Sequence, residues 1–202
     1  MYAYLDLETT GLDPQNDLII ECAIAVVDDE LEVLDQRLYV FPLSGWIQNK
    51  LDRADPIVIT MHTANHLIAE MAKLQAQGNS MSYNYYKGCM EADILGWFEI
   101  LGVPEHEVEL AGSGVHFDRM FLREFCPQVE AFFHYRNWDT SVMKRMVQRW
   151  APEYYRRNPL FEYESSHRAL PDVMHSIEVT KLARNVVTMS ESLWQKSEQA
   201  TL

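Results

Sequence analysis

The alternation of apolar and polar side chains predicts three strands at the start of the chain. Residues 2–7 (YAYLDL) have the pattern of a strand, and the apolar stretches 18–28 and 31–41 predict two more, joined by a tight turn at residues 28–30. The intervening segment TTGLDPQND is rich in turn-forming residues and predicts a loop.

After the third strand the pattern changes to mainly helical spacing, interrupted by short strands. Val58, Met61, His62 and Asn65 recur at helical spacing after Pro56, and Pro171 is a residue favoured at a first helical position. The expected elements are a helical stretch from about residue 56, an exposed loop at 75–88, a helix at 89–101, a short buried strand at 108–111, a helix at 117–125, a strand at 135–139, a helix at 140–150, an irregular segment at 151–166 and a last helix from Pro171.

Three successive strands, followed by strands that alternate with helices, indicate an α/β fold with a mixed sheet flanked by helices. The 202 residues suit one domain spanning 1–202, with a core at about 1–187 and a C-terminal tail at about 188–202. The longest apolar runs, such as 18–20 and 23–27, are far shorter than the roughly 20 residues that a membrane span needs, so no membrane association is expected.

The start of the chain and its cysteines favour the cytoplasm. The sequence begins MYAYLDLETTG without a basic segment, so we expect no signal peptide. Cys22, Cys89 and Cys126 are odd in number and too widely spaced for a zinc knuckle or a disulfide framework.

The net charge of −13 argues against a protein that coats long nucleic acid, which needs a broad basic surface. It still permits an enzyme that binds a short strand through metal ions. Residues 1–35 contain no Lys or Arg, whereas basic side chains crowd a later stretch, for which a solvated helix face is the simplest interpretation. These residues are Arg136, Lys144, Arg145, Arg149, Arg156, Arg157 and Arg168.

Two carboxylates lie at the end of the first predicted strand. Alternation along a strand puts Asp6 and Glu8 on one face and turns Leu7 into the core. Carboxylates side by side repel each other unless a cation lies between them, and such oxygen ligands suit Mg²⁺ or Mn²⁺. Thr9 and Thr10 follow in a flexible turn whose hydroxyls and amides suit the end of a nucleic-acid strand. A D-x-E pair alone also occurs on surface strands, so further motifs must support the hypothesis.

Two later segments supply candidate partners for this pair. In ELAGSGVHFDRMFL, Asp118 is expected in the first turn of a helix that follows a buried strand, where an acidic residue also favours the helix dipole. In HRALPD, His167 precedes Asp172 by five residues. A surface histidine and an ordinary helix-start aspartate are the alternatives for this last segment.

Taken in order, LDLETTGLD, the Asp118 segment and the H-x-A-x-x-D pattern of HRALPD resemble the three motifs of the DEDD 3′→5′ exonucleases, in the version that uses a histidine as base. The resemblance implies a ribonuclease-H-like fold with a five-stranded sheet, and two divalent cations, Mg²⁺ or Mn²⁺, held by Asp6, Glu8, Asp118 and Asp172. It also implies that His167 is the catalytic base, because a histidine with an ordinary pKa near 6.5 can accept a proton near neutral pH.

Within that superfamily the chain most resembles oligoribonuclease, from Met1 to about Arg184. MHTANHL (61–67) and VEAFFHYRNWDTSVMKRMVQRW (129–150) carry the likeness. It implies hydrolysis of short single-stranded RNA to nucleoside 5′-monophosphates by a homodimer, in which Tyr135 reaches the neighbouring subunit's site. The substrate-binding residues expected from the loop and from the resemblance are Thr9, Thr10, Leu12, His62, Tyr135, Arg136 and Ser141.

Three departures from the oligoribonuclease pattern affect the expected substrate preference. Ile57 stands where the family has a tryptophan, and Gly114, beside Ser113, stands where it has a serine. The Gln75–Met90 region is longer than its counterpart. Stacking of an aromatic ring on a base contributes roughly 1–3 kcal/mol, so these changes weaken the expected preference for dinucleotides but leave the metal chemistry intact.

Two alternatives remain at the level of sequence. A single-stranded DNA exonuclease of the proofreading or repair type shares the catalytic residues but has no reason to keep the 129–150 segment. A non-catalytic nucleic-acid-binding module could keep the fold, although the complete set of carboxylates argues against it, since unused buried carboxylates are costly.

Overall fold

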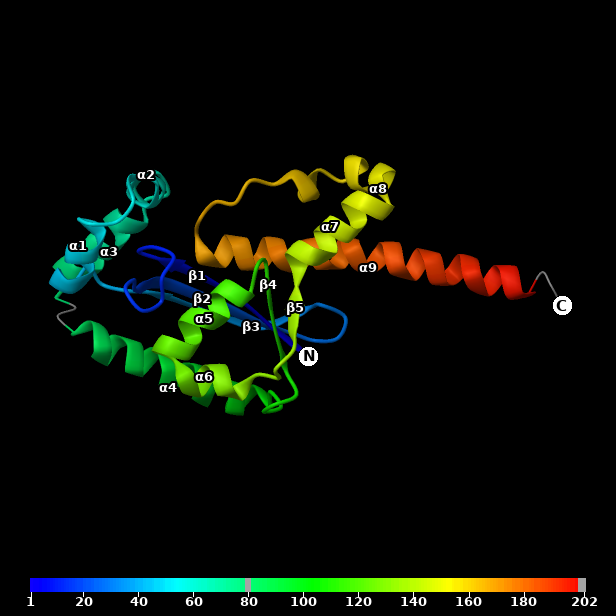
Figure 1. The fold of residues 1–202 in the computed structure, drawn as a ribbon. Helices are drawn as coiled ribbons and strands as arrows, with labels where there is room; N and C mark the ends of the chain where they lie inside the picture. The colour runs from blue at the N-terminus through cyan, green and yellow to red at the C-terminus, as the bar shows by residue number, and fades with distance from the viewer. Residues whose placement is uncertain (79–80, 200–202) are drawn as a thin grey trace.

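A mixed five-stranded sheet in the order β3-β2-β1-β4-β5 forms the centre of the molecule (Figure 1). The computed structural model describes residues 1–78 and 81–199, with side chains described up to residue 189. β1 pairs antiparallel with β2 and parallel with β4, which continues in parallel to β5. This confirms the predicted mixed sheet. The strands are β1 (Tyr2–Thr9), β2 (Ile19–Val27), β3 (Val33–Val40), β4 (Glu109–Gly112) and β5 (Asn137–Asp139).

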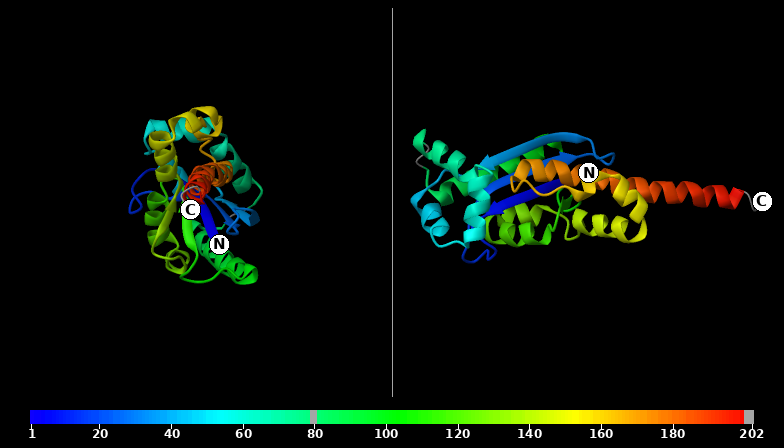
Figure 2. Two further views of the ribbon diagram at one scale, coloured as in Figure 1. Left: turned by 90° about the vertical axis from the view of Figure 1, so that its right-hand side faces the viewer. Right: turned by 90° about the horizontal axis from the view of Figure 1, so that it is seen from above.

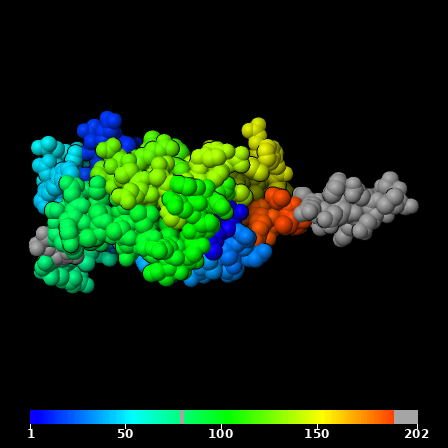
Figure 3. Space-filling model, turned by 90° about the horizontal axis from the view of Figure 1, so that it is seen from below, coloured from blue at the N-terminus to red at the C-terminus, as the bar shows by residue number. Residues whose placement is uncertain are grey.

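Helices cover both faces of this sheet. The long helix α9 crosses one face, whereas α4, α5 and α6 cover the other, as the view from below shows (Figures 1, 2 and 3). α1, α2 and α3 gather at one end of the sheet, and α7 and α8 lie beside α9 (Figures 1 and 2). The helices are α1 (Gly45–Leu51), α2 (Pro56–Ala64), α3 (Leu67–Ala76), α4 (Tyr83–Leu101), α5 (His116–Phe125), α6 (Pro127–Phe132), α7 (Thr140–Trp150), α8 (Pro152–Arg157), the 3-10 helix η1 (Pro159–Glu162) and α9 (Ala169–Gln199).

The side chains of β2 explain how both faces are filled. Cys22, Ile24 and Val26 belong to the core under α4–α6, whereas Ala23 and Ala25 belong to the core under α9. The small alanines let α9 approach the sheet closely. A central strand with both faces covered has a nearly continuous run of apolar residues. β2 is such a strand, because all nine of its residues are buried.

The exposed loop expected at residues 75–88 is wrong over much of its length. α3 continues to Ala76 and α4 begins at Tyr83, after Ser82 accepts a hydrogen bond from the backbone N–H of Tyr85 as a helix cap. The Tyr83 ring is buried against Phe41, and its hydroxyl accepts the Ile19 N–H at 3.1 Å. A single buried aromatic residue therefore positions this turn, and the polar residues around it hide the helical period.

Other differences concern short elements and the ends of helices. The short helices α1, α6 and α8 are absent from the sequence prediction, and α8 with η1 occupies part of the segment predicted as irregular. α9 begins at Ala169, two residues before Pro171. The predicted boundary between core and tail, near residues 187–188, lies inside α9, and residues 200–202 of the predicted tail lie outside the described residues.

No helix within the described residues is both long enough and apolar enough to span a bilayer.

Candidate active site

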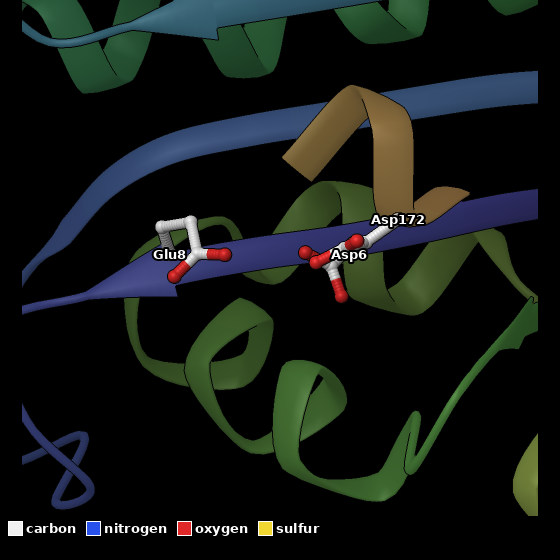
Figure 4. A group of neighbouring side chains, drawn as sticks. All are labelled: Asp6, Glu8 and Asp172. Atoms are coloured by element: carbon white, nitrogen blue, oxygen red, sulfur yellow. The ribbon is translucent and has the colours of Figure 1, made fainter. Parts of the chain in front are cut away.

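Three carboxylates meet between β1 and the first turn of α9. Asp6 and Glu8 project from β1 toward α9, and Asp172 projects back toward them (Figure 4). One ligand oxygen from each lies within 4.8 Å of the others. The predicted common face of Asp6 and Glu8 is confirmed, and Leu7 lies in the core on the opposite face.

Asp118, the fourth predicted ligand, approaches β1 from the first turn of α5. β4 pairs with β1 only as far as Tyr4, so the edge of β1 beyond that point is free of strand partners on this side. The backbone N–H of Leu7 donates to Asp118 Oδ1 at 3.0 Å. Asp118 does not share the close group formed by the other three carboxylates among the described residues. The hydrogen bond from Leu7 nevertheless attaches Asp118 to β1, the strand that carries Asp6 and Glu8.

Close approach of the backbone is required at the end of β4 to bring α5 to this position. A Cβ at Gly112 would lie 2.6 Å from the Leu5 carbonyl oxygen, well inside a normal contact. Gly112 therefore allows β4 to end directly against β1, and the chain then turns into α5.

Burial raises the pKa values of Asp6, Glu8 and Asp118. Burial is the largest cause for Asp6, whose pKa lies well above its usual range, and the charges of Asp118 and Glu8 add to it. Burial, then the charges of Glu21 and Asp172, raises the pKa of Glu8 to about 8. Burial likewise raises the pKa of Asp118 to about 8, against the opposing hydrogen bond from Leu7.

This set of side chains fits divalent cations. Buried and half-buried carboxylates that face one another are costly as anions unless positive charge compensates them. Their all-oxygen donor set is the one that Mg²⁺ and Mn²⁺ prefer. The structure therefore contains an acidic group suited to hold a divalent metal.

Hydroxyl and amide groups from the segment before α9 hold Asp172 in place. Tyr163 Oη donates to Asp172 Oδ1 at 3.5 Å, and the backbone N–H and Oγ of Ser166 donate to the same oxygen at 3.1 and 3.2 Å. Ser165 Oγ donates to the other oxygen, Oδ2. The segment predicted as irregular thus orients one of the carboxylates.

His167 lies on the exposed rim of this group. Its backbone is in the left-handed region, with φ at 51°, and its N–H donates to Ser165 Oγ at 3.0 Å. Its Nδ1 lies 3.4 Å from the same hydroxyl, and its carbonyl accepts from Asn65 Nδ2. Ser165 therefore contacts both His167 and Asp172, which links the predicted base to a predicted ligand.

The loop after β1 holds three predicted substrate-binding residues in different environments. The Leu12 side chain is 79% exposed. Thr10 is fully buried, and its hydroxyl donates to Asp17 and accepts the Leu18 N–H. The Thr9 hydroxyl donates to the Gly11 carbonyl. Both hydroxyls hold the loop in shape, and a role in substrate binding stays a prediction.

His62, also predicted near the substrate, is fully buried behind Glu8. Its Nε2 lies 3.0 Å from the Thr9 carbonyl oxygen, and its Nδ1 lies 3.9 Å from Glu8 Oε2. Burial lowers the pKa of His62, which favours the neutral imidazole. The structure thus places His62 against the backbone of Thr9, at the end of β1.

The remaining predicted residues lie at β5 and the start of α7. Tyr135 is largely exposed, and the Arg136 guanidinium lies 5.3 Å from the centre of its ring. Ser141 Oγ donates to Asp139 Oδ1 at 2.6 Å, and the same oxygen accepts the Gly114 N–H. Asp139 therefore joins the loop before α5 to the start of α7.

A cavity of about 220 Å³ opens beside two of the carboxylates. Lys144 lines it and forms no ion pair with a described carboxylate. None of the predicted substrate-binding residues lines this cavity. Its full lining is Asp6, Ser113, Thr140, Lys144, Tyr163, Ser165, Asp172, His175, Ser176 and Val179.

Several residues around the site lie outside the three motifs, although the sequence contains a recognisable pattern for each. Glu21 is the one acidic residue in the apolar strand IIECAIAVV and is 1% exposed. Ser165 and Ser166 immediately precede the His167 motif. A lone charge inside an apolar strand and hydroxyls beside a motif are both recognisable patterns, but their partners are far away in the sequence.

The chain is similar in sequence to known exonucleases. A family model described as Exonuclease matches residues 4–180. Oligoribonuclease from Dichelobacter nodosus is 33% identical over 94% of this chain and 96% of its own length. Oligoribonuclease from Vibrio cholerae is also 33% identical, over 91% of this chain and 93% of its own length.

Solved structures show the same fold in more distant proteins. Exonuclease I from Methylocaldum szegediense aligns with a TM-score of 0.61 at 18% identity, over 91% of this chain. Exonuclease I from E. coli in a complex with single-stranded DNA aligns at 0.59 and 19% identity. This chain spans only about 40% of these longer proteins. They confirm the predicted ribonuclease-H-like fold.

The chain belongs to the Exonuclease family. Its resemblance to the oligoribonucleases is confirmed over most of its length.

The raised pKa values predict how the stability of the protein without metal depends on pH. A carboxyl group whose pKa rises from 4.5 when unfolded to about 8 when folded, as for Glu8, stabilises the folded state fully below the unfolded pKa. That contribution is lost as the pH rises through 8. In EDTA, the midpoint of thermal unfolding should therefore fall from pH 6 to pH 8.

Magnesium is expected to offset this fall, because a divalent cation needs deprotonated carboxylates as ligands. The stabilisation by Mg²⁺, measured as the shift in unfolding midpoint, should thus increase from pH 6 to pH 8. Glu8→Gln removes one titrating group and should flatten the fall in EDTA. A midpoint in EDTA that rises over this range would contradict the assignment of the raised pKa values.

Proposed function

We propose that this protein is a metal-dependent 3′→5′ exoribonuclease that hydrolyses short single-stranded RNA to nucleoside 5′-monophosphates. The observation that carries the proposal is the convergence of Asp6, Glu8 and Asp172 within 4.8 Å, with Asp118 bonded to the same strand. The identity with oligoribonucleases over nearly the whole chain supports RNA as the substrate.

In this proposal each residue of the site has a separate task. Asp6, Glu8, Asp118 and Asp172 hold two divalent cations, Mg²⁺ or Mn²⁺. These ions, when bound, neutralise charge on the scissile phosphate and activate the attacking water. His167 accepts the proton of that water, which its exposed position on the rim allows. The oxygen of the water bonds to phosphorus, and the bond from phosphorus to the 3′ oxygen of the preceding nucleotide breaks. That oxygen takes up a proton from solvent and becomes the new 3′-hydroxyl end of the strand.

We propose that the side chains around the carboxylates set the orientation of the substrate strand. The exposed Leu12 lies in the loop after Glu8 and would contact the terminal base. The 220 Å³ cavity lies beside Asp6 and Asp172, and we propose that it receives the next part of the strand. Lys144, which forms no ion pair with a carboxylate among the described residues, would face a phosphate there. Arg136 and Ser141 would add contacts near the same end of the substrate.

We also propose that the protein acts as a cytoplasmic homodimer. Tyr135 is 74% exposed and carries Arg136 on its ring, an arrangement suited to contact with a second subunit. Cys22, Cys89 and Cys126 are all free, as a reducing compartment favours. Light scattering at micromolar concentration tests the oligomeric state. The molecular mass of a monomer under these conditions would contradict the proposed homodimer.

The preference for substrate length should be weaker than the oligoribonuclease pattern implies. Ile57 is 75% exposed at the start of α2, where the family has a tryptophan that could stack on a base. A dinucleotide has few other contacts with which to replace that stacking. We expect kcat/KM for RNA of two, three, five and ten nucleotides to differ by less than about a hundredfold, equivalent to about 2.7 kcal/mol.

The measurement uses 5′-labelled RNA and matched DNA of the same lengths. Ile57→Trp is the matched variant, and it should raise kcat/KM for the dinucleotide more than for the ten-residue strand. A dinucleotide preference above a hundredfold in the parent would show that Ile57 does not limit the site. A clear preference for DNA would favour the alternative function, a single-stranded DNA exonuclease.

A further inference from the structure

Arg168 makes a network of ion pairs at the start of α9. Its Nε lies 3.0 and 3.2 Å from the two carboxylate oxygens of Glu21, and its Nη2 lies 2.7 Å from Glu21 Oε1. Nη2 also donates to Glu70 Oε2 at 2.6 Å. The backbone N–H of Ala169 donates to Glu21 Oε2 at 2.9 Å. Glu21 therefore accepts hydrogen bonds both from the Arg168 side chain and from the first backbone N–H of the helix.

Glu21 lies directly beside the metal-binding face of the sheet. In the pairing of β1 with β2, Glu21 is opposite Glu8, and both side chains face α9. Arg168 is four residues before Asp172, whose N–H donates to the Arg168 carbonyl at 3.2 Å. One helical turn thus separates the ion pair with β2 from the carboxylate that meets Asp6 and Glu8.

The burial of this ion pair indicates that Arg168 pairs with carboxylates of the protein and does not bind a substrate. Glu21 is 1% exposed and the Arg168 side chain 22%. A buried carboxylate without its partner is strongly unfavourable. A guanidinium with two carboxylate partners is also poorly suited to bind a substrate phosphate, since both pairs would have to be replaced. The solvated basic face predicted from the sequence therefore does not include Arg168.

The same network reaches the helices at the end of the sheet. Glu70 belongs to α3, and Asn65, at the end of α2, donates to the His167 carbonyl. The chain on both sides of the His167–Arg168 peptide is consequently held by the segment that runs from α2 to α3.

We propose that Arg168 is a positioning residue that docks the first turn of α9 on β2, so that Asp172 reaches Asp6 and Glu8 in the geometry that binds metal. This inference rests on the proposed function, because it concerns the same metal-binding carboxylates. Residues that orient metal ligands commonly change metal affinity by about 10–100-fold when replaced.

The test compares Mn²⁺ affinity, measured by calorimetry, in the parent protein and in Arg168→Met. Loss of the docking contacts should weaken Mn²⁺ binding at least tenfold, and should raise by a similar factor the Mn²⁺ concentration that gives half-maximal RNA hydrolysis. Arg184→Met is the matched control, because Arg184 pairs with Glu30 and donates to the Asp29 backbone carbonyl at a more distal part of α9. It should bind Mn²⁺ with the parent's affinity.

Arg168→Lys separates geometry from charge and remains informative if Arg168→Met does not fold. Lysine keeps the positive charge but loses the planar fork that contacts both oxygens of Glu21. Its Mn²⁺ affinity should therefore stay at least threefold below the parent's. Parental affinity in either Arg168 variant would overturn the inference. A parent protein that binds no Mn²⁺ would instead overturn the proposed function.

Discussion

Asp172→Asn is expected to lower kcat by about three orders of magnitude or more, since it removes one of the four proposed metal ligands, which we propose act as a unit. Asparagine has nearly the same shape: its amide oxygen can still accept the hydrogen bonds from Tyr163 and Ser166, and its amide nitrogen can donate to Ser165 Oγ. The fold should therefore survive. Hydrolysis of a short RNA with saturating Mg²⁺ is the measurement, together with the thermal unfolding midpoint.

The thermal unfolding midpoint tests the role of Asp172 independently of the activity measurement. The charge of Asp172 raises the pKa values of Asp6 and Glu8, so its removal relieves repulsion. In EDTA, Asp172→Asn should unfold at a higher temperature than the parent, although it is inactive.

Asp93→Asn is the control for this variant. Asp93 accepts a hydrogen bond from Tyr39 on the surface of α4 and is not among the carboxylates of the site. Its replacement should leave kcat unchanged. Parental turnover in Asp172→Asn, or full activity of the parent in EDTA, would refute the metal-dependent mechanism.

His167→Ala is expected to lower kcat by about 10²–10³-fold, the usual contribution of a general base. Because the imidazole is proposed to accept a proton and not to bind metal, the Mn²⁺ affinity should change little. KM for RNA should also change little. The measurements are kcat, KM and Mn²⁺ binding by calorimetry.

The backbone at His167 requires a second variant. Its φ of 51° is unfavourable for alanine, whereas asparagine adopts this region more readily. His167→Asn should therefore show the same loss of kcat without added backbone strain. His106→Ala is the control, because His106 is exposed and also has a positive φ, at 61°. A tenfold loss of Mn²⁺ affinity in His167→Asn would make His167 a ligand and not the base.

The sequence alone was sufficient for features that depend on local period and local motif. Alternation along residues 2–7 predicted that Asp6 and Glu8 share a face, and the structure brings them together. The apolar run of β2 and the helical period of the later segments predicted the mixed sheet and its covering helices. Asp118 was likewise expected in a first helical turn, which is where it lies. Each depends on side chains a few residues apart.

Short elements without a clear period were not predictable in this way. The start of α4 at Tyr83 depends on contacts with Phe41 and Ile19, about forty and sixty residues away. α1, α6 and α8 are too short to show an apolar period. Their formation follows from packing against the rest of the chain, as expected for short helices, which are marginal in isolation.

The tertiary structure alone decided how charged residues far apart in the sequence form one site. Asp118 bonds to Leu7 only because β4 stops pairing at Tyr4 and leaves that edge of β1 open. Arg168 resembled one member of a basic surface stretch until the pairing of β1 with β2 placed Glu21 beside Glu8. Strand pairing and helix docking join residues more than a hundred positions apart, and the periodicity of a sequence contains no record of such partners.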